Sequence, residues 1–138
     1  MTESPVRQLR LVVEAADTAE YETAVAFFRD ALGLDQEGFY LSANDARVTI
    51  LQAGRATLEI INPAQKAMID EVEVGRPVAP KFRVAFQVDD AATTTDALVA
   101  AGAELLAAPT RTPWDSLNAR LAAPAGVQIT VFQELAEP

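Results

Sequence analysis

The stretch KFRVAFQVDD at residues 81–90 sets the pattern of the whole chain. Within it, large apolar side chains alternate with smaller or polar ones. The apolar set is Phe82, Val84, Phe86 and Val88, and the other set is Arg83, Ala85 and Gln87. Alternation with a period of two predicts a strand that packs one face on a core. The two aspartates that follow favour the start of a helix, because short carboxylates accept hydrogen bonds from free backbone N–H groups there.

This stretch has an earlier copy in the chain. Residues 10–17, RLVVEAAD, match residues 83–90, RVAFQVDD, position by position: both begin with arginine, alternate in the same phase and end with aspartate. Corresponding residues lie 69 to 73 positions apart: Arg10 and Arg83, Gly33 and Gly102, Glu59 and Thr130. Such a regular offset predicts one module written twice, with small insertions in the loops.

Each copy predicts the element order β-α-β-β-β. In the first copy we expect strands at residues 8–14, 39–41, 47–52 and 57–61 and an amphipathic helix at 20–32. In the second we expect a strand from 81, a helix at 91–101, strands at 104–107, 117–122 and 127–133, and a loop at 109–115. A linker at 63–80 carries a short helix at 64–72. The chain is thus predicted to be a single domain, 1–138, with module 1 at about 6–62 and module 2 at about 81–135.

Composition disfavours several classes of partner. The 138 residues carry a formal net charge of −9, from 11 basic and 20 acidic residues, which argues against nucleic acid and anionic membranes. No apolar run approaches the roughly 20 residues of a membrane span, and residues 1–5 lack the basic start of a secretory signal. We therefore expect a cytoplasmic protein whose partner is a small molecule.

Two residue types that carry much enzyme chemistry are missing. The sequence has no cysteine and no histidine, which removes disulfides, thiolate chemistry, the commonest general base and the commonest nitrogen ligand for transition metals. It also contains no nucleophile–base pair and no glycine-rich phosphate loop.

Several short segments, taken in order, resemble the vicinal oxygen chelate superfamily, which includes glyoxalase I, extradiol dioxygenases and bleomycin-resistance proteins. The resemblance spans about residues 8–134. The matching segments are AFFRDALGL at 26–34, VAFQVDD at 84–90, AAGAELL at 100–106, Pro113-Trp114, and APAG at 123–126. The resemblance implies an α+β fold in which two βαβββ modules form one cupped mixed sheet with helices on its outer face. It also implies a homodimer.

In metal-dependent members of the superfamily, the first and last strands of each module carry the metal ligands. The matching positions here are Arg10, Glu59, Arg83 and Thr130, and only Glu59 is a usual ligand type. Arginine has donors only and stays protonated, so it does not ligate a cation. Because a metal site needs at least three protein ligands, we expect neither a metal nor another cofactor.

The same positions have both functional and structural interpretations. Glu59 interrupts an apolar strand and is either a cavity carboxylate, acting as a base or an anchor, or a structural partner for one of the arginines. Arg10 and Arg83 either clamp an anionic group bidentately or lie half-exposed at the rim of the cup.

Four further positions are candidates for the cavity wall. Glu14 and Gln87 form the other matched inward pair, Trp114 offers an amphipathic ring, and Tyr40 suits the cavity mouth. Plain packing is the alternative explanation for Trp114, and the sequence favours it slightly. By contrast, the acidic residues of the linker, Asp70, Glu71 and Glu73, are expected to form a solvated face.

Two functions are compatible with these residues. The first is a metal-independent protein that binds a small organic molecule through Arg10, Glu14, Glu59, Arg83, Gln87, Trp114 and Thr130, and the acidic balance of the chain favours a cationic or aromatic compound. The second is a lyase or isomerase of the glyoxalase type that uses Glu59 as its catalytic base. The sequence leaves open whether the protein is an enzyme.

Overall fold

The computed structural model describes residues 5–135, except for the side chain of Ala125. This range forms eight strands, three α-helices, a π-helix and two short 3-10 helices. The strands are β1 Val6–Glu14, β2 Gln36–Leu41, β3 Arg47–Ala53, β4 Ala56–Ile61, β5 Phe82–Val88, β6 Glu104–Arg111, β7 Ser116–Ala123 and β8 Val127–Glu134. The helices are α1 Thr18–Val25, α2 Pro63–Glu73 and α3 Ala91–Ala100, with the π-helix at Ala26–Ala31 and 3-10 turns at Ala43–Asp45 and Pro124–Gly126.

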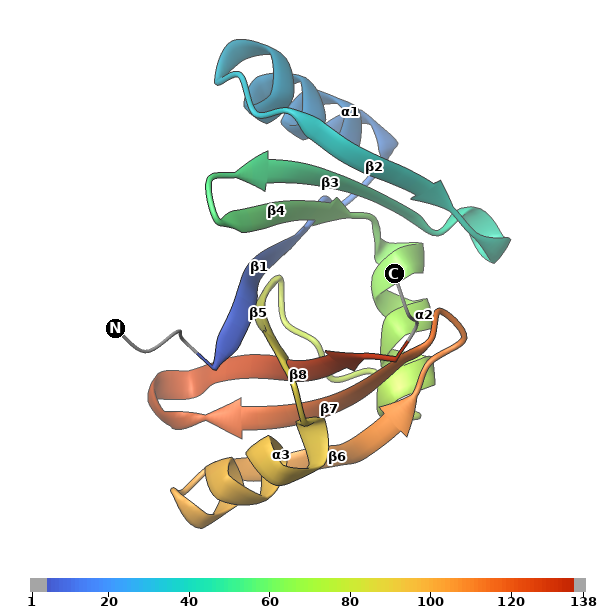
Figure 1. The fold of residues 1–138 in the computed structure, drawn as a ribbon. Coiled ribbons are helices and arrows are strands. Elements are labelled where there is room, and N and C mark those ends of the chain that lie inside the picture. Colours follow the sequence, from blue (N-terminus) through green and yellow to red (C-terminus); the bar gives the residue numbers. More distant parts are fainter. Residues whose placement is uncertain (1–4, 136–138) are drawn as a thin grey trace.

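All eight of these strands form one mixed sheet in the order β2-β3-β4-β1-β5-β8-β7-β6. Each half repeats one arrangement, since β1 runs parallel to β4 and β5 runs parallel to β8. The halves join where β1 pairs antiparallel with β5. Figure 1 shows the first half above and the second half below this junction. The predicted α+β fold with a cupped mixed sheet is confirmed.

The register at the junction shows that the two arginines are equivalent. Arg10 pairs with Ala85, and Arg83 pairs with Val12. In the parallel pairs, Val12 lies opposite Glu59 and Ala85 lies opposite Thr130. Exchanging the two halves therefore exchanges Arg10 with Arg83 and Glu59 with Thr130, as the sequence repeat predicted.

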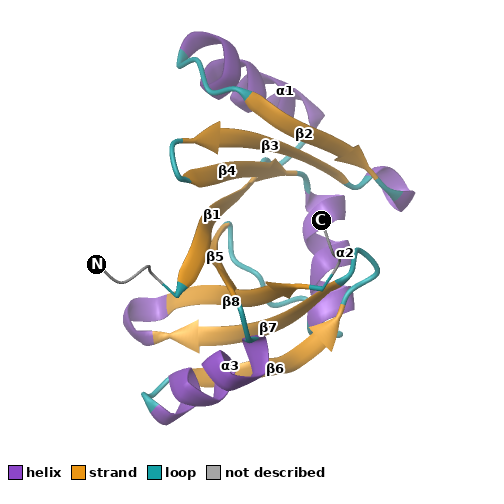
Figure 2. Ribbon diagram, viewed as in Figure 1, coloured by secondary structure: helices purple, strands orange, loops and turns teal. Residues whose placement is uncertain are grey.

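Helices α1 and α3 cover the outer face of the sheet, one on each half (Figure 2). Tyr21 and Val25 of α1 pack with Leu58 and Ile60 of β4 in one core cluster. Ala91 of α3 lies in a second cluster, which is formed with residues of β5, β7 and β8 in the second half. Burying one large apolar side chain contributes about 1.5–3 kcal/mol, so these two clusters are the main source of stability for the outer layer.

Two elements differ from the sequence-based expectation. The helix expected at residues 20–32 is an α-helix only to Val25 and continues as a π-helix. The loop expected at residues 109–115 is shorter, because β6 continues through Pro109 to Arg111. Proline removes a ladder donor, but β6 is an edge strand of the sheet, where that loss is tolerated.

Helix α2 lies on the opposite, concave side of the sheet and crosses from the first half to the second. It contacts β3 in the first half and both β6 and β7 in the second. Asn62 fixes its start, because the side-chain Oδ1 accepts hydrogen bonds from the backbone N–H of Gln65 at 2.9 Å and of Arg47 at 3.0 Å. None of the helices in residues 5–135 has the length and apolar character needed to cross a membrane.

Candidate functional site

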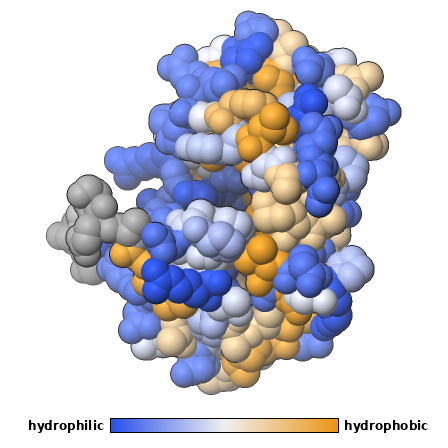
Figure 3. Space-filling model, turned by 90° about the vertical axis from the view of Figure 1, so that its right-hand side faces the viewer, coloured by the Kyte–Doolittle hydropathy of each residue, from blue (hydrophilic) through white to orange (hydrophobic). Residues whose placement is uncertain are grey.

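A cavity of about 510 Å³ lies between the concave face of the sheet and α2. Strands of both halves form its wall, and α2 contributes Gln65, Met68 and Ile69. The space-filling view shows the surface hollowed between the two halves on the side that carries α2 (Figure 3). Pockets for small molecules have volumes of about 300–1,000 Å³, so the cavity is large enough to enclose one.

Five of the predicted ligand-binding residues line this cavity, and two do not. The lining residues are Arg10, Glu59, Arg83, Trp114 and Thr130. The four strand residues gather there because the strand register points the same parity inward in both halves, and Trp114 comes from the turn between β6 and β7. Ligand binding by these five residues stays a prediction.

Glu14 and Gln87 are the two predicted residues that do not line the cavity. Glu14 is the last residue of β1, and its Oε1 accepts a hydrogen bond from Lys66 Nζ of α2 at 3.0 Å. Gln87 pairs with Gln8, beyond the cavity end of β5. Both share the inward parity of the arginines, but they lie at the two ends of the strands, where the cavity does not reach.

Arg10 has its charge compensated by neighbouring groups. Its Nη1 lies 3.5 Å from Glu59 Oε2, and its Nη2 lies 3.7 Å from Glu134 Oε1. Its Nε donates a hydrogen bond to Gln8 Oε1 at 2.7 Å, and the guanidinium carbon lies 4.4 Å from the centre of the Phe132 ring. The ion pair expected between Glu59 and one of the arginines is present.

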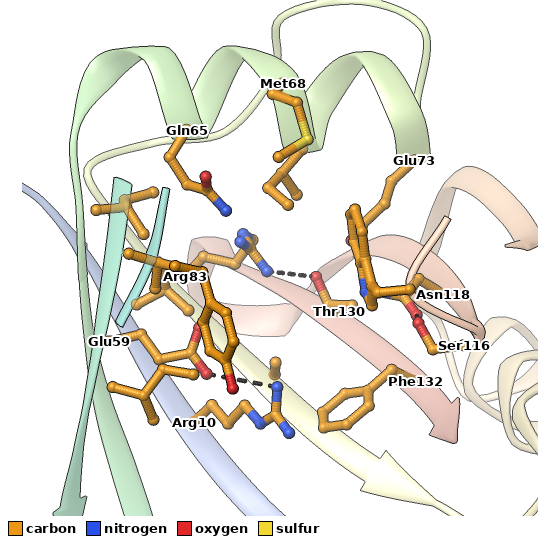
Figure 4. Close-up of a pocket in the computed structure, with 18 of the residues that line it drawn as sticks. Arg10, Glu59, Gln65, Met68, Glu73, Arg83, Ser116, Asn118, Thr130 and Phe132 are labelled. Carbon is orange, nitrogen blue, oxygen red and sulfur yellow. Dashed lines mark hydrogen bonds and ion pairs between the residues drawn. The ribbon is translucent and has the colours of Figure 1, made fainter. Parts of the chain in front are cut away.

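Glu59 projects from the centre of β4 into the cavity (Figure 4). Its side chain is 13% exposed, and within residues 5–135 its buried Oε2 accepts no hydrogen bond. Burial raises the pKa of the Glu59 carboxyl above its ordinary value, and the charges of Arg10 and Arg83 offset this only in part. Glu59 is thus a carboxyl group that binds a proton more readily than an exposed glutamate.

Arg83 is buried more deeply than Arg10, with 8% of its surface exposed. Its Nη1 donates a hydrogen bond to Thr130 Oγ1 at 2.7 Å. No carboxylate in the described part of the chain forms an ion pair with it. Burial lowers the pKa of the Arg83 guanidinium, and the positive charge of Arg120 adds to this effect, while the negative charges of Glu73, Glu59 and Asp70 oppose it.

Aromatic side chains stand at the outer part of the cavity wall. Trp114 lines the cavity and is 43% exposed, and Tyr40 of β2 lines it and is 59% exposed. These positions agree with the expectation for Tyr40 and with the wall interpretation of Trp114. Each ring can contact an apolar ligand body while its polar atom faces water.

The expectation that Asp70 and Glu73 belong to a solvated acidic face is wrong. Asp70 is 2% exposed and Glu73 is 4% exposed, while Glu71 is exposed as expected. Both buried carboxylates bind Arg120 of β7, which is fully buried: Nη1 lies 2.8 Å from Asp70 Oδ1, and Nη2 lies 2.8 Å from Glu73 Oε1. Glu73 Oε2 also accepts a hydrogen bond from Asn118 Nδ2 at 2.7 Å.

These contacts anchor the end of α2 against the second half of the sheet. Asp70 Oδ2 accepts hydrogen bonds from the backbone N–H groups of Val78 and Ala79, both at 2.9 Å. Burial alone would raise the pKa of Asp70, but these hydrogen bonds and the one from Arg120 lower it below its ordinary value. The helix that roofs the cavity is therefore held by a buried charge network.

Sequence reasoning missed the contribution of α2 to the cavity. Four lining residues lie on one face of this helix at positions i, i+3, i+4 and i+8: Gln65, Met68, Ile69 and Glu73. That spacing was visible in the sequence. A second missed signal was an arginine at position 120 within an apolar strand, because a buried guanidinium requires carboxylate partners elsewhere in the chain.

The cavity does not offer a suitable donor set for a divalent cation. Of the four superfamily ligand positions, two hold guanidinium groups, and the hydroxyl of Thr130 accepts a hydrogen bond from Arg83. Only Glu59 carries a ligand type. Elsewhere in residues 5–135, no cluster of three acidic side chains is arranged to hold a metal ion. The residues present do not fit the metal of the superfamily.

Comparison with known families identifies the fold. The sequence-family model of the glyoxalase-like domain matches residues 12–132 of the chain. The chain belongs to the glyoxalase-like family. The resemblance to the vicinal oxygen chelate superfamily is thereby confirmed. A comparison with curated protein sequences finds no match.

Solved structures with the same fold include proteins of several kinds. Methylmalonyl-CoA epimerase from Mycobacterium tuberculosis has a TM-score of 0.64 and 18% identity, over 99% of this chain and 93% of that one. A glyoxalase/bleomycin resistance protein/dioxygenase superfamily member from Vibrio splendidus 12B01 has a TM-score of 0.59 and 13% identity, over 91% of this chain and 97% of that one. A mutant of 4-hydroxymandelate synthase from Streptomyces coelicolor has a TM-score of 0.63 and 26% identity, over 100% of this chain and 40% of that one.

Proposed function

We propose that this glyoxalase-like protein binds a small organic molecule in the cavity under α2 and does so without a metal ion. The observation that carries the proposal is the occupancy of the four superfamily ligand positions by Arg10, Glu59, Arg83 and Thr130, all of which line the cavity. Two guanidinium groups repel a divalent cation, but they bind polar groups of an organic ligand. We further propose that the protein is cytoplasmic and acts as a homodimer.

The mixed character of the cavity wall supports an organic ligand. Val12, Ile50, Ile61 and Phe132 offer apolar surface, and the charged side chains are confined to a few points between them. This combination is typical of small-molecule sites, where apolar contacts supply affinity and a few polar groups set orientation.

The proposal is tested by mass spectrometry of the protein after purification under native conditions. We expect a small organic compound to be released on denaturation and no stoichiometric transition metal by elemental analysis. Glu59→Gln keeps the size of the side chain and is expected to weaken binding of that compound by more than about tenfold, or 1.4 kcal/mol, without loss of the fold. If Glu59→Gln binds normally but melts several degrees lower, the carboxylate is structural and the ligand site lies elsewhere.

A second candidate function is proton transfer by Glu59, as in a lyase or isomerase of the glyoxalase type. The raised pKa of this buried carboxyl favours it, because a general base works best when its pKa lies close to the working pH. Glu59 would remove a proton from carbon, leave the electron pair as an enolate and return the proton. Thr130 occupies the equivalent position in the other half, so a single base would serve both steps.

This candidate is distinguished from simple binding by isotope exchange. The methylmalonyl-CoA epimerases that share the fold are epimerases by name, so carbon acids are suitable test compounds. An isomerase should exchange a C–H proton of the bound compound with D₂O, and Glu59→Gln should abolish the exchange. Retention of the compound without exchange would leave binding as the function.

A further inference from the structure

Among residues 5–135, Arg83 has no carboxylate within ion-pair distance, although the charges of Glu59, Glu73 and Asp70 act on it from farther away. Its guanidinium carries five N–H donors, and the described chain supplies one hydrogen-bond acceptor, Thr130 Oγ1 at 2.7 Å. Only 8% of the residue's surface is exposed to solvent. A buried charge without an ion-pair partner is unfavourable. The remaining donors face the cavity, which Arg83 lines.

A comparison of the two halves shows that Arg83 lacks the nearby carboxylates that Arg10 has. Arg10, at the equivalent position in the first half, has Glu59 at 3.5 Å and Glu134 at 3.7 Å. The position equivalent to Glu59 in the second half is Thr130, a neutral residue. Among the described residues, the arginine of the first half therefore has carboxylates at ion-pair distance, and the arginine of the second half has none.

We propose that the ligand is an organic acid whose carboxylate pairs with Arg83. This inference rests on the proposed binding function and names its ligand class. The carboxylate would supply the negative charge that Thr130 does not, and a planar guanidinium binds a carboxylate through two parallel hydrogen bonds.

Gln65 of α2 completes the anion site from the opposite side. Figure 4 shows its side chain pointing from the helix toward the guanidinium of Arg83. Gln65 is 8% exposed, and its Oε1 has no hydrogen-bond partner among residues 5–135. Oε1 is an acceptor, so the partner it lacks is a donor rather than a carboxylate. The amide nitrogen Nε2, which is the end of the side chain nearer Arg83 in Figure 4, would donate a hydrogen bond to a carboxylate held against Arg83.

The rest of the wall limits the ligand to one negative charge. Four carboxylate residues line the cavity together with the two arginines: Glu37, Glu59, Glu73 and Glu134. A second anionic group would meet these carboxylates and be repelled. The body of the ligand therefore carries no second negative charge, and it lies against apolar residues such as Met68 and Phe132.

The experiment uses three probes of nearly equal shape: phenylacetate, phenylacetamide and phenethylamine. Trp114 is the sole tryptophan and lines the cavity, so its fluorescence reports occupancy, and the melting temperature reports binding to the folded state. We expect phenylacetate to quench Trp114 and to raise the melting temperature, and phenylacetamide to bind at least about tenfold more weakly.

Variants of the chain test the role of Arg83 itself. Arg83→Met should weaken phenylacetate binding at least about tenfold, because it removes the guanidinium that pairs with the carboxylate. Thr130→Glu should also block phenylacetate, because the new carboxylate pairs with Arg83. Arg55→Gln, in the exposed turn between β3 and β4, removes an equal charge outside the cavity and should leave binding unchanged.

The outcomes separate the ligand class from the binding function. Equal or tighter binding of phenylacetamide or phenethylamine to the wild type would overturn the organic-acid inference and leave the binding function standing. Phenylacetate binding that survives both Arg83→Met and Thr130→Glu would overturn it as well. Absence of a response to all three probes, with no compound carried through purification, would overturn the proposed function itself. If Arg83→Met does not fold, the wild-type probe series and Thr130→Glu decide.

Discussion

Arg120→Met should destabilise the protein strongly, although the replacement has similar length and is apolar. Arg120 is fully buried and lies 2.8 Å from Asp70 Oδ1 and 2.8 Å from Glu73 Oε1. The substitution leaves both carboxylates buried without their cation. Removing one partner of a buried ion pair costs about 3–5 kcal/mol. Since small domains are stable by about 5–15 kcal/mol, we expect the free energy of unfolding to fall by a large fraction.

The chain contains a matched control for this experiment. Arg111 on β6 lies 2.7 Å from Asp115, so the separation of the charges is nearly the same, but the two side chains are 68% and 51% exposed. Exposed ion pairs contribute about 0–1 kcal/mol, because water screens the charges in both the folded and the unfolded state. Arg111→Met should therefore change the free energy of unfolding by no more than about 1 kcal/mol.

Urea denaturation of the wild type and both variants, followed by circular dichroism, measures the difference. A loss below about 1 kcal/mol for Arg120→Met, or equal losses for the two variants, would refute the reasoning that burial decides the effect. If Arg120→Met is unfolded without urea, Arg120→Lys replaces it. Lysine keeps the charge but lacks the planar fork that reaches two carboxylates, so it should give a smaller loss.

Three further predictions concern the cavity and the assembly. Because burial raises the pKa of Glu59, the protonated form is favoured on folding: its stabilising effect is complete below the ordinary pKa of about 4.3 and is lost as the pH rises through the folded-state pKa. Glu59→Gln should therefore match the wild type in melting temperature near pH 4 and exceed it at pH 8, and a lower melting temperature at pH 8 would contradict this. Zinc, nickel, manganese or iron should leave the melting temperature unchanged, and one equivalent of tightly held metal in elemental analysis would disprove it. Light scattering at micromolar concentration should give the mass of a homodimer, and a monomer would count against the proposed assembly.

The architecture could be predicted because the decisive signals are local or periodic. Alternation within residues 81–90 is a property of one strand, and the offset between Arg10 and Arg83 required no knowledge of contacts. The strand register places both arginines on the concave face. Glu59 lies opposite Val12, two residues after Arg10, and Thr130 lies opposite Ala85, two residues after Arg83. The inward positions of the site followed directly from the repeat.

The errors concern pairs that are far apart in the sequence. Asp70 and Glu73 were assigned to solvent because acidic residues near a linker are usually exposed, yet their partner Arg120 lies 50 and 47 residues away. Glu14 and Gln87 were assigned to the cavity from parity alone. Parity tells which face of the sheet a side chain is on, but the extent of the cavity along the strand depends on where α2 lies, and this is a tertiary property.

The difference between Glu59 and Thr130 also determines how a guest molecule is seated. In a cup with identical halves, exchange of the halves would map one pose onto another of equal energy, and a guest would occupy both. Here one end of the cup presents a carboxyl group, and the other presents the Thr130 hydroxyl bound to an arginine that has no ion-pair partner among the described residues, so the two poses differ in energy. A factor of ten in their populations requires only about 1.4 kcal/mol. The duplicated, nearly two-fold framework therefore binds a ligand in one preferred orientation. Any reaction at Glu59 would then occur at the same end of the ligand each time.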